Sequence, residues 1–113
     1  MLKAAHRLKG DNNFKRLSRK GRSFFTPRLT LRIVKNEEQE SRVAFIVSTK
    51  VSKKAAVRNK VKRRMREIVR NIMPQIKPGY DILIIAKIST LKLGYKELDN
   101  ELQQLLKKAR LIT

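Results

Sequence analysis

The chain has no cysteine, no tryptophan and a single histidine, His6, among its 113 residues. Without thiols it can form no disulfide, no thiolate zinc site and no cysteine nucleophile. One imidazole cannot build a histidine-rich metal site or a catalytic pair with cysteine. Aromatic residues make up only 5% of the chain, and no predicted strand carries a ladder of stacking aromatics of the kind found in RNA-recognition motifs. These absences argue against a protein that performs catalysis with its own side chains.

Acidic residues are also scarce, with 9 Asp and Glu against 29 Lys and Arg, which gives a net charge of +20. A catalytic carboxylate pair needs acids gathered in a pocket, whereas here they are scattered along the chain. Glu97 and Glu101 lie one helical turn apart and could touch a metal, but an exposed helix surface explains them better. A monomer of this charge repels itself unless a polyanion neutralises it. Nucleic acid is therefore the first hypothesis for a partner.

Long apolar runs are missing as well. No window approaches the roughly 20 apolar residues of a membrane span, and the first ten residues lack the apolar core of a signal peptide. We therefore predict a cytoplasmic protein that does not enter membranes. The length predicts a single domain over residues 1–113, in which residues 1–10 form a flexible basic tail.

Positive charge is concentrated in residues 50–70, which hold ten Lys or Arg and one acid, Glu67. A helix that is merely solvated usually interleaves both signs of charge. Apolar residues recur here at spacings of three and four, which predicts a helix over residues 55–72. Its apolar stripe consists of Val57, Val61, Met65, Ile68, Val69 and Ile72. Arg58 projects near the edge of this stripe, so we expect it to lie against the margin of a sheet.

The other elements follow from periodicity and from turn residues. A short helix is predicted over residues 12–19, capped by Asp11 or Asn12 and stopped by Gly21. Strands are predicted at 28–33 and 42–48, joined as an antiparallel hairpin by an acidic turn at 36–40. The nearly continuous apolar run 80–86 predicts a central strand, parallel to the strand before the basic helix. An amphipathic helix at 95–110 completes an α+β, single-domain α/β sandwich with a small mixed sheet.

The segment Arg58-Asn59-Lys60-Val61-Lys62-Arg63-Arg64-Met65-Arg66-Glu67 resembles the RNR signature of the bacterial ribonuclease P protein subunit. The approach Val47–Ala55, the opening Arg7-Leu8-Lys9 with Asn13-Phe14, and the strand Asp81–Ala86 are also similar to that family. The resemblance covers about residues 7–110. It implies an αβββαβα fold, ribosomal protein S5 domain 2-like, with an unusual left-handed βαβ crossover that is an exception to the right-handed rule.

The resemblance also implies partners and roles. In this family the RNA subunit performs Mg²⁺-dependent hydrolysis that removes the 5′ leader of precursor tRNA, and the protein subunit supplies no catalytic residue, holds no metal of its own and needs no protein partner. Residues that would bind the catalytic RNA are Arg58, Asn59, Lys60, Lys62, Arg63, Arg66 and Arg70. Residues that would line a cleft for the single-stranded leader are Phe14, Thr30, Arg32, Lys50 and Arg58. Many members carry a second aromatic four residues after the first, where this chain has Ser18.

Two alternatives stay open at this stage. A structural ribosomal protein could use the same basic helix on ribosomal RNA. A metal-dependent nuclease could use Asp81 or the pair Glu97 and Glu101, and it would then lose activity when these acids are replaced.

Overall fold

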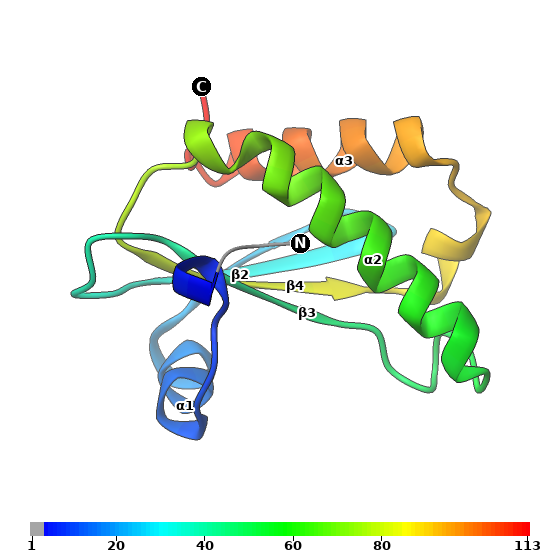
Figure 1. Ribbon diagram of the computed structural model, residues 1–113, viewed down its shortest axis with the longest axis horizontal. Coiled ribbons are helices and arrows are strands. Elements are labelled where there is room, and N and C mark those ends of the chain that lie inside the picture. Colours follow the sequence, from blue (N-terminus) through cyan, green and yellow to red (C-terminus); the bar gives the residue numbers. More distant parts are fainter. Residues whose placement is uncertain (1–3) are drawn as a thin grey trace.

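The computed structural model describes residues 4–113 as a four-stranded mixed sheet with helices on both faces (Figure 1). The main elements are α1 (Asp11–Lys20), β1 (Arg22–Phe25), β2 (Leu29–Lys35), β3 (Arg42–Ile46), α2 (Ala55–Ile72), β4 (Tyr80–Ala86) and α3 (Tyr95–Lys108). Three short 3-10 helices, Ala4–His6, Met73–Gln75 and Ile88–Lys92, complete the fold. Within residues 4–113, no helix combines the length and the apolar character that crossing a membrane requires.

The strands lie in the order β1-β2-β4-β3. β4 runs antiparallel to β2 and parallel to β3, so the parallel strand–helix–strand unit predicted around α2 is confirmed. The predicted hairpin between β2 and β3 is wrong, because β4 lies between these two strands. A strand that is apolar on both sides buries most of its apolar surface when it has a neighbouring strand at each edge and a helix layer on each face. β4 therefore takes the centre, although it comes late in the chain.

β1 is an additional strand that periodicity did not predict. Its four residues pair antiparallel with β2, from Arg22 opposite Ile33 to Phe25 opposite Thr30. The connection is tight: the Thr26 amide donates to the Leu29 carbonyl at 2.8 Å, and the Leu29 amide donates to Thr26 Oγ1 at 2.9 Å. A strand of this length is too short to show a clear alternation in sequence.

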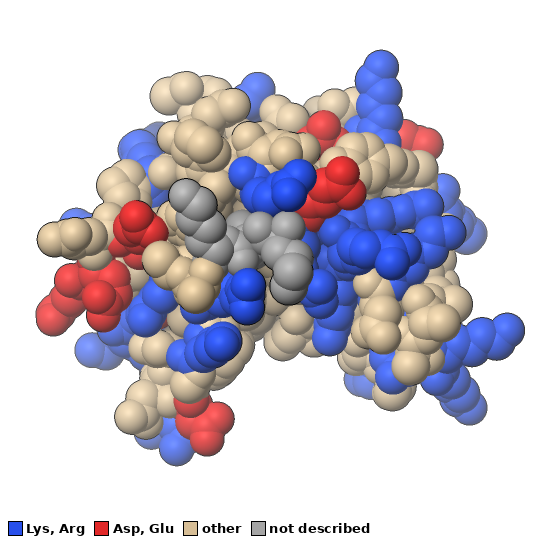
Figure 2. All heavy atoms as spheres, viewed as in Figure 1, with Lys and Arg blue, Asp and Glu red and all other residues tan. Residues whose placement is uncertain are grey.

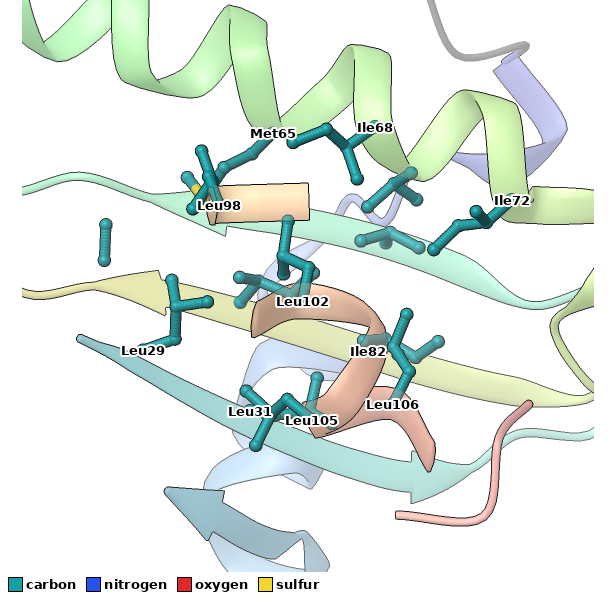
Figure 3. Close-up of a cluster of buried hydrophobic side chains, with 14 of the residues drawn as sticks. Leu29, Leu31, Met65, Ile68, Ile72, Ile82, Leu98, Leu102, Leu105 and Leu106 are labelled. Atoms are coloured by element: carbon teal, nitrogen blue, oxygen red, sulfur yellow. The ribbon is translucent and has the colours of Figure 1, made fainter. Parts of the chain in front are cut away.

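The main core fills the space between one face of the sheet and the two long helices (Figure 3). Met65 and Ile68 of α2 and Leu98 and Leu102 of α3 point toward the strand residue Leu29 and its neighbours. The predicted stripe of α2 is confirmed, with Val61, Met65, Ile68, Val69 and Ile72 buried. Val57, at the first turn, is only half-buried. This layer fixes which side of α2 remains for solvent.

The opposite face of the sheet is covered only in part, by α1 (Figure 1). Leu17 of α1 is buried against Leu83 of β4 and against Leu8. Leu8 belongs to the predicted tail, yet it is buried and its amide donates to the Val43 carbonyl at 3.0 Å. Residues 4–10 therefore pack along the edge of β3 rather than standing apart from the domain. The rest of the predicted tail, residues 1–3, lies outside the described residues.

α1 begins one residue earlier than predicted. Gly10, with φ of 94°, precedes the helix, and the two residues predicted as caps, Asp11 and Asn12, are its first residues. The positive φ explains why glycine stands there. The predicted stop at Gly21 is confirmed, since its amide donates to the Leu17 carbonyl at 3.0 Å.

Candidate RNA-binding site

The solvent side of α2 is almost entirely basic. Because the apolar stripe is turned to the core, the remaining positions of the helix point outward. Four of the residues predicted to bind the catalytic RNA are exposed: Asn59, Lys60, Arg63 and Arg70. The other three are half-buried: Arg58, Lys62 and Arg66. Lys and Arg side chains gather over α2, while acidic atoms gather at the left, where the turn between β2 and β3 lies (Figure 2). Some acidic atoms also lie beside the basic ones in this view, but cations predominate over α2, as a polyanion-binding surface requires.

The N-terminal end of α2 carries the predicted edge residue Arg58. Its guanidinium is half-buried, and Nη1 donates to the Ser52 carbonyl at 2.9 Å. This bond ties the first turn of α2 to the segment that follows β3. Lys50 lies exposed in that same segment. The two cations therefore stand at the end of the sheet where β3 and β4 finish.

A groove of about 410 Å³ runs along the outer edge of β3, between α2 and α1. Phe14, predicted for the leader, lies here together with Lys62 and Arg66, predicted for the catalytic RNA. The rest of the lining consists of Arg7, Leu8, Lys9, Val43, Ala44 and Phe45. A groove with aromatic and apolar walls and a rim of cations is suited to single-stranded nucleic acid, because bases can stack while phosphates pair with the cations.

Six of the nine residues that line this groove were not predicted as binding residues, and three of these six carry a charge or an aromatic ring: Arg7, Lys9 and Phe45. Arg7 and Lys9 were assigned to the basic tail, and Phe45 was assigned only to a strand. The burial of Leu8 between the two cations explains their position, because an alternation of charged and apolar residues lets this short segment lie flat against β3. The alternation Arg7-Leu8-Lys9 was the sequence signal that could have placed these two cations against the sheet.

A second surface is the part of the sheet that α1 leaves uncovered. The strand register places Phe25, Thr30, Ile85 and Ile46 side by side across all four strands, on the face opposite the main core. We call this row the open sheet face. Phe25 and Ile46 are exposed, while Thr30 and Ile85 are half-buried. Among the predicted leader residues, Thr30 belongs to this row.

Arg32, by contrast, is engaged inside the protein. Its guanidinium lies under the C-terminal end of α1, where Nε donates to the Leu17 carbonyl and Nη2 to the Ser18 carbonyl at 2.8 Å. Nη1 donates to Ser23 Oγ. The last carbonyls of a helix are short of partners within the helix. Arg32 adds a bond to the Leu17 carbonyl, which also accepts from the Gly21 amide, and one to the Ser18 carbonyl, and it supplies the positive charge that this end favours. The residue predicted for the leader cleft therefore also anchors α1.

Asp81 is the centre of a buried ion-pair network. Its carboxylate is fully buried and accepts from Arg42 Nε at 2.9 Å, Arg42 Nη2 at 3.0 Å and Arg16 Nη2 at 2.7 Å. Asn36 Nδ2 adds a fourth bond at 2.9 Å. With its oxygens occupied and hidden from solvent, Asp81 holds α1, β3 and β4 together. It offers nothing to a substrate.

The other two acids of the nuclease alternative are also engaged. Glu97 Oε1 accepts from the Gly94 amide at 3.4 Å at the start of α3, and Glu101 Oε2 pairs with Arg28 Nη1 at 3.4 Å. No group of three or more His, Cys, Asp or Glu within residues 4–113 is placed to hold a metal ion. The arrangement therefore lends the nuclease alternative no support.

Comparison with known proteins agrees with this geometry. The family model described as ribonuclease P matches residues 2–110. The ribonuclease P protein component of Clostridioides difficile is 41% identical over 102 residues, 89% of each chain. That of Synechocystis is 36% identical, over 94% of this chain and 86% of the relative. The chain belongs to the ribonuclease P protein family.

Solved structures of the family show the same fold. A ribonuclease P protein mutant from Staphylococcus aureus superposes with a TM-score of 0.89 at 29% identity, covering 96% of this chain and 91% of that chain. The protein from Thermotoga maritima superposes with a TM-score of 0.82 at 30% identity, covering 89% of this chain and 97% of that chain. The similarity thus extends over nearly the whole fold. The segment 58–67, which resembles the RNR signature, lies on α2, with Val61 and Met65 turned to the core and its charged residues turned outward.

Proposed function

We propose that this protein is the RNA-binding subunit of a ribonuclease P ribonucleoprotein, which acts in the cytoplasm. Through the basic side of α2 it binds the catalytic RNA, and through the β3 groove and the open sheet face it binds the 5′ leader of precursor tRNA. The observation that carries the proposal is the family's RNR segment displayed on a helix whose outward positions are nearly all cationic. The enzyme is then the complex, and the protein contributes binding rather than chemistry.

The division of RNA partners follows from the shapes of the surfaces. The solvent side of α2 is the outer surface of a single helix of 18 residues. Its row of cations can pair with the phosphates of a folded RNA. The groove that contains Phe14 is concave and partly apolar, which suits unpaired nucleotides. Lys62 and Arg66 line the groove and belong to α2, so both RNAs would meet at these two side chains. Charge there would reduce the repulsion between the two phosphate backbones.

For the leader we retain Phe14, Thr30, Arg32, Lys50 and Arg58 as contact residues. Arg32 has a second part in the proposal, because three of its five N–H donors are used within the protein. By anchoring the C-terminal end of α1, it supports the helix on which Phe14 stands. Because α1 has Ser18 where many family members have a second aromatic residue, Phe14 is the side chain of α1 that can stack on a base.

Magnesium belongs to the RNA in this proposal. Mg²⁺ prefers several water ligands and oxygen donors such as phosphates, and residues 4–113 bring no set of carboxylates together for it. When bound to the RNA, Mg²⁺ supplies the chemistry of phosphodiester hydrolysis. The protein's own residues neutralise phosphate charge and orient the leader.

Reconstitution with the cognate RNA subunit tests the proposal directly. At low millimolar Mg²⁺, where repulsion between the RNAs is poorly screened, adding the protein should raise the rate of leader removal and the affinity for precursor tRNA. At high Mg²⁺ the difference should shrink, because the cation screens the same charges. Precursor processing that is unchanged by the protein at low Mg²⁺ would refute the proposed role.

The salt dependence of RNA binding identifies the surface. Removal of one cation that pairs with a phosphate should reduce the slope of log affinity against log salt concentration by about 0.7 to 0.9. We therefore expect Arg63→Gln on α2 to lower both affinity and slope. Lys107→Gln on α3 is the matched control, since it removes one exposed charge from a helix to which the proposal gives no RNA. Equal effects of the two variants would show that only net charge matters.

A further inference from the structure

Phe25 stands at the β1 end of the open sheet face with 60% of its surface exposed. Its neighbour Phe24 turns the other way and packs against the main core. Phe25 is therefore held outward by the alternation of a regular strand, in register with Thr30 of β2. A single exposed ring would need no explanation, but Phe25 continues the partly apolar row of the open sheet face, and contiguous exposed apolar surface is typical of a binding site.

A cation is fixed at this ring. Lys87 follows β4, and its Nζ lies 5.7 Å from the centroid of the Phe25 ring. The same Nζ donates to the Thr26 carbonyl at 2.9 Å, while the Lys87 amide donates to the Arg28 carbonyl at 3.0 Å. The tight turn that follows Phe25 thus holds the ammonium group and the ring together before any ligand arrives. Such pre-organisation lowers the entropy cost of binding.

The chemistry of this pair points to RNA rather than to protein. An aromatic face with a neighbouring ammonium group can stack a base and pair with its phosphate. The acid near the turn, Glu101, is already paired with Arg28. Because the chain has a net charge of +20, a polyanion that approaches this end of the sheet is attracted electrostatically.

We propose that Phe25 and Lys87 form a separate nucleotide-binding position that extends the leader site across the sheet to β1. This inference rests on the proposed function, because it assigns the position to the same single strand. Phe25 lies three strand spacings from Ile46 on β3, or about 14 Å. A strand of RNA that enters at the β3 side must therefore cross β4 and β2 before it reaches Phe25. Only leaders beyond a certain length can use this position.

The test measures affinity as a function of leader length. The reconstituted complex is titrated with precursor tRNAs whose leaders grow by one nucleotide at a time. Wild-type protein should show a further gain in affinity at the length where the strand reaches Phe25. Phe25→Ala should lose that last gain, about 5- to 150-fold, and keep the affinity for shorter leaders. Phe25→Leu should behave like Phe25→Ala, because it keeps an apolar side chain but removes the ring.

Leu91→Ala is the matched control. Leu91 is exposed like Phe25 and lies in the segment that follows Lys87, but it has no ring. Its replacement should leave the whole length curve unchanged. Thermal unfolding of each variant shows whether a lost gain reflects lost structure, and we expect Phe25→Ala to unfold at nearly the wild-type temperature because its ring is exposed.

Three outcomes would contradict the inference in distinguishable ways. If wild-type affinity does not depend on the leader at all, the proposed leader site fails and this position fails with it. If the leader raises affinity but Phe25→Ala follows the wild-type curve, only the position at Phe25 is wrong. If Phe25→Ala changes only the association state of the protein in sedimentation, the exposed ring serves a protein contact and the assignment to RNA is wrong.

Discussion

On the face of the sheet that α2 and α3 cover, the strands present Leu29, Leu31, Ile82 and Ile84, and the space is closed by apolar side chains alone. On the face that α1 covers, the same strands present Arg32 and Asp81, and α1 is held by hydrogen bonds and ion pairs around a small apolar cluster. The first face carries one continuous apolar core, whereas the second is covered only in part. The comparison shows how one small sheet can both support a core and present a binding surface.

Apolar contacts should dominate stability on the closed face. Leu102 of α3 is fully buried there, so Leu102→Ala should lower the free energy of unfolding by roughly 2–5 kcal/mol through lost burial and the cavity that remains. Denaturant unfolding followed by circular dichroism measures this change. The exposed Leu91→Ala should stay within about 0.5 kcal/mol of wild type. A small loss at Leu102 would mean that the closed face can collapse around a cavity.

Charge should matter most on the face that α1 covers. Asp81→Asn keeps the shape of the side chain but removes the charge that pairs with Arg16 and Arg42. We expect a loss of roughly 1.5–3 kcal/mol in the free energy of unfolding. Asp11→Asn, which changes an exposed acid on the same face, is the control. If added salt abolished the difference between wild type and Asp81→Asn, the pair would be screened like a surface contact, contrary to its burial.

Removal of the Arg32 anchor should loosen α1 more than it destabilises the whole protein. Arg32→Met loses three hydrogen bonds at a half-buried site, and the expected global cost is about 1 kcal/mol. Hydrogen exchange should become faster at the amides of α1 before it changes elsewhere. Arg28→Met, at an exposed arginine just before β2, should leave α1 unchanged. Equal protection of α1 in both variants would show that the Asp81 network alone holds this helix.

The smallest effect on stability is expected at the cations of α2 that lie outside its apolar stripe. Arg58→Ala and Arg66→Ala change residues outside the apolar stripe of α2, so each should alter the free energy of unfolding by about 0.5 kcal/mol or little more. Both should weaken RNA binding. Filter binding and thermal unfolding on the same samples separate the two properties. A collapsed thermal transition in Arg66→Ala would contradict its placement at the rim of the groove.

Local patterns predicted the closed face well. The bounds of α2 and β4 agree with the sequence prediction, because each element has a long and clear period or an unbroken apolar run. The acidic turn at 36–40 was read as a hairpin because its two flanking strands alternate and lie close in sequence. No local signal could show that β4, some forty residues later, would separate them.

The face that α1 covers was harder to predict because its contacts are made by long polar side chains over large sequence distances. Arg32 was correctly placed on the non-core side of β2, but its contacts with the carbonyls of Leu17 and Ser18 were not predicted. Arg16 and Asp81 are far apart in sequence, and nothing in either segment marks the pair. The groove needed the fold as well, since Arg7, Phe14 and Lys62 come from three separate elements.

The central position of β4 also has a consequence for the order of events during synthesis. β2 and β3 have been translated by residue 46, yet each lacks its principal neighbour until residues 80–86 follow. At about 5–20 residues per second, the ribosome needs roughly 2–7 seconds to synthesise the residues between β3 and β4, which include the whole of α2. The polycationic helix is therefore made before the strand that completes the sheet beneath it. Folding of this chain must wait for its C-terminal third.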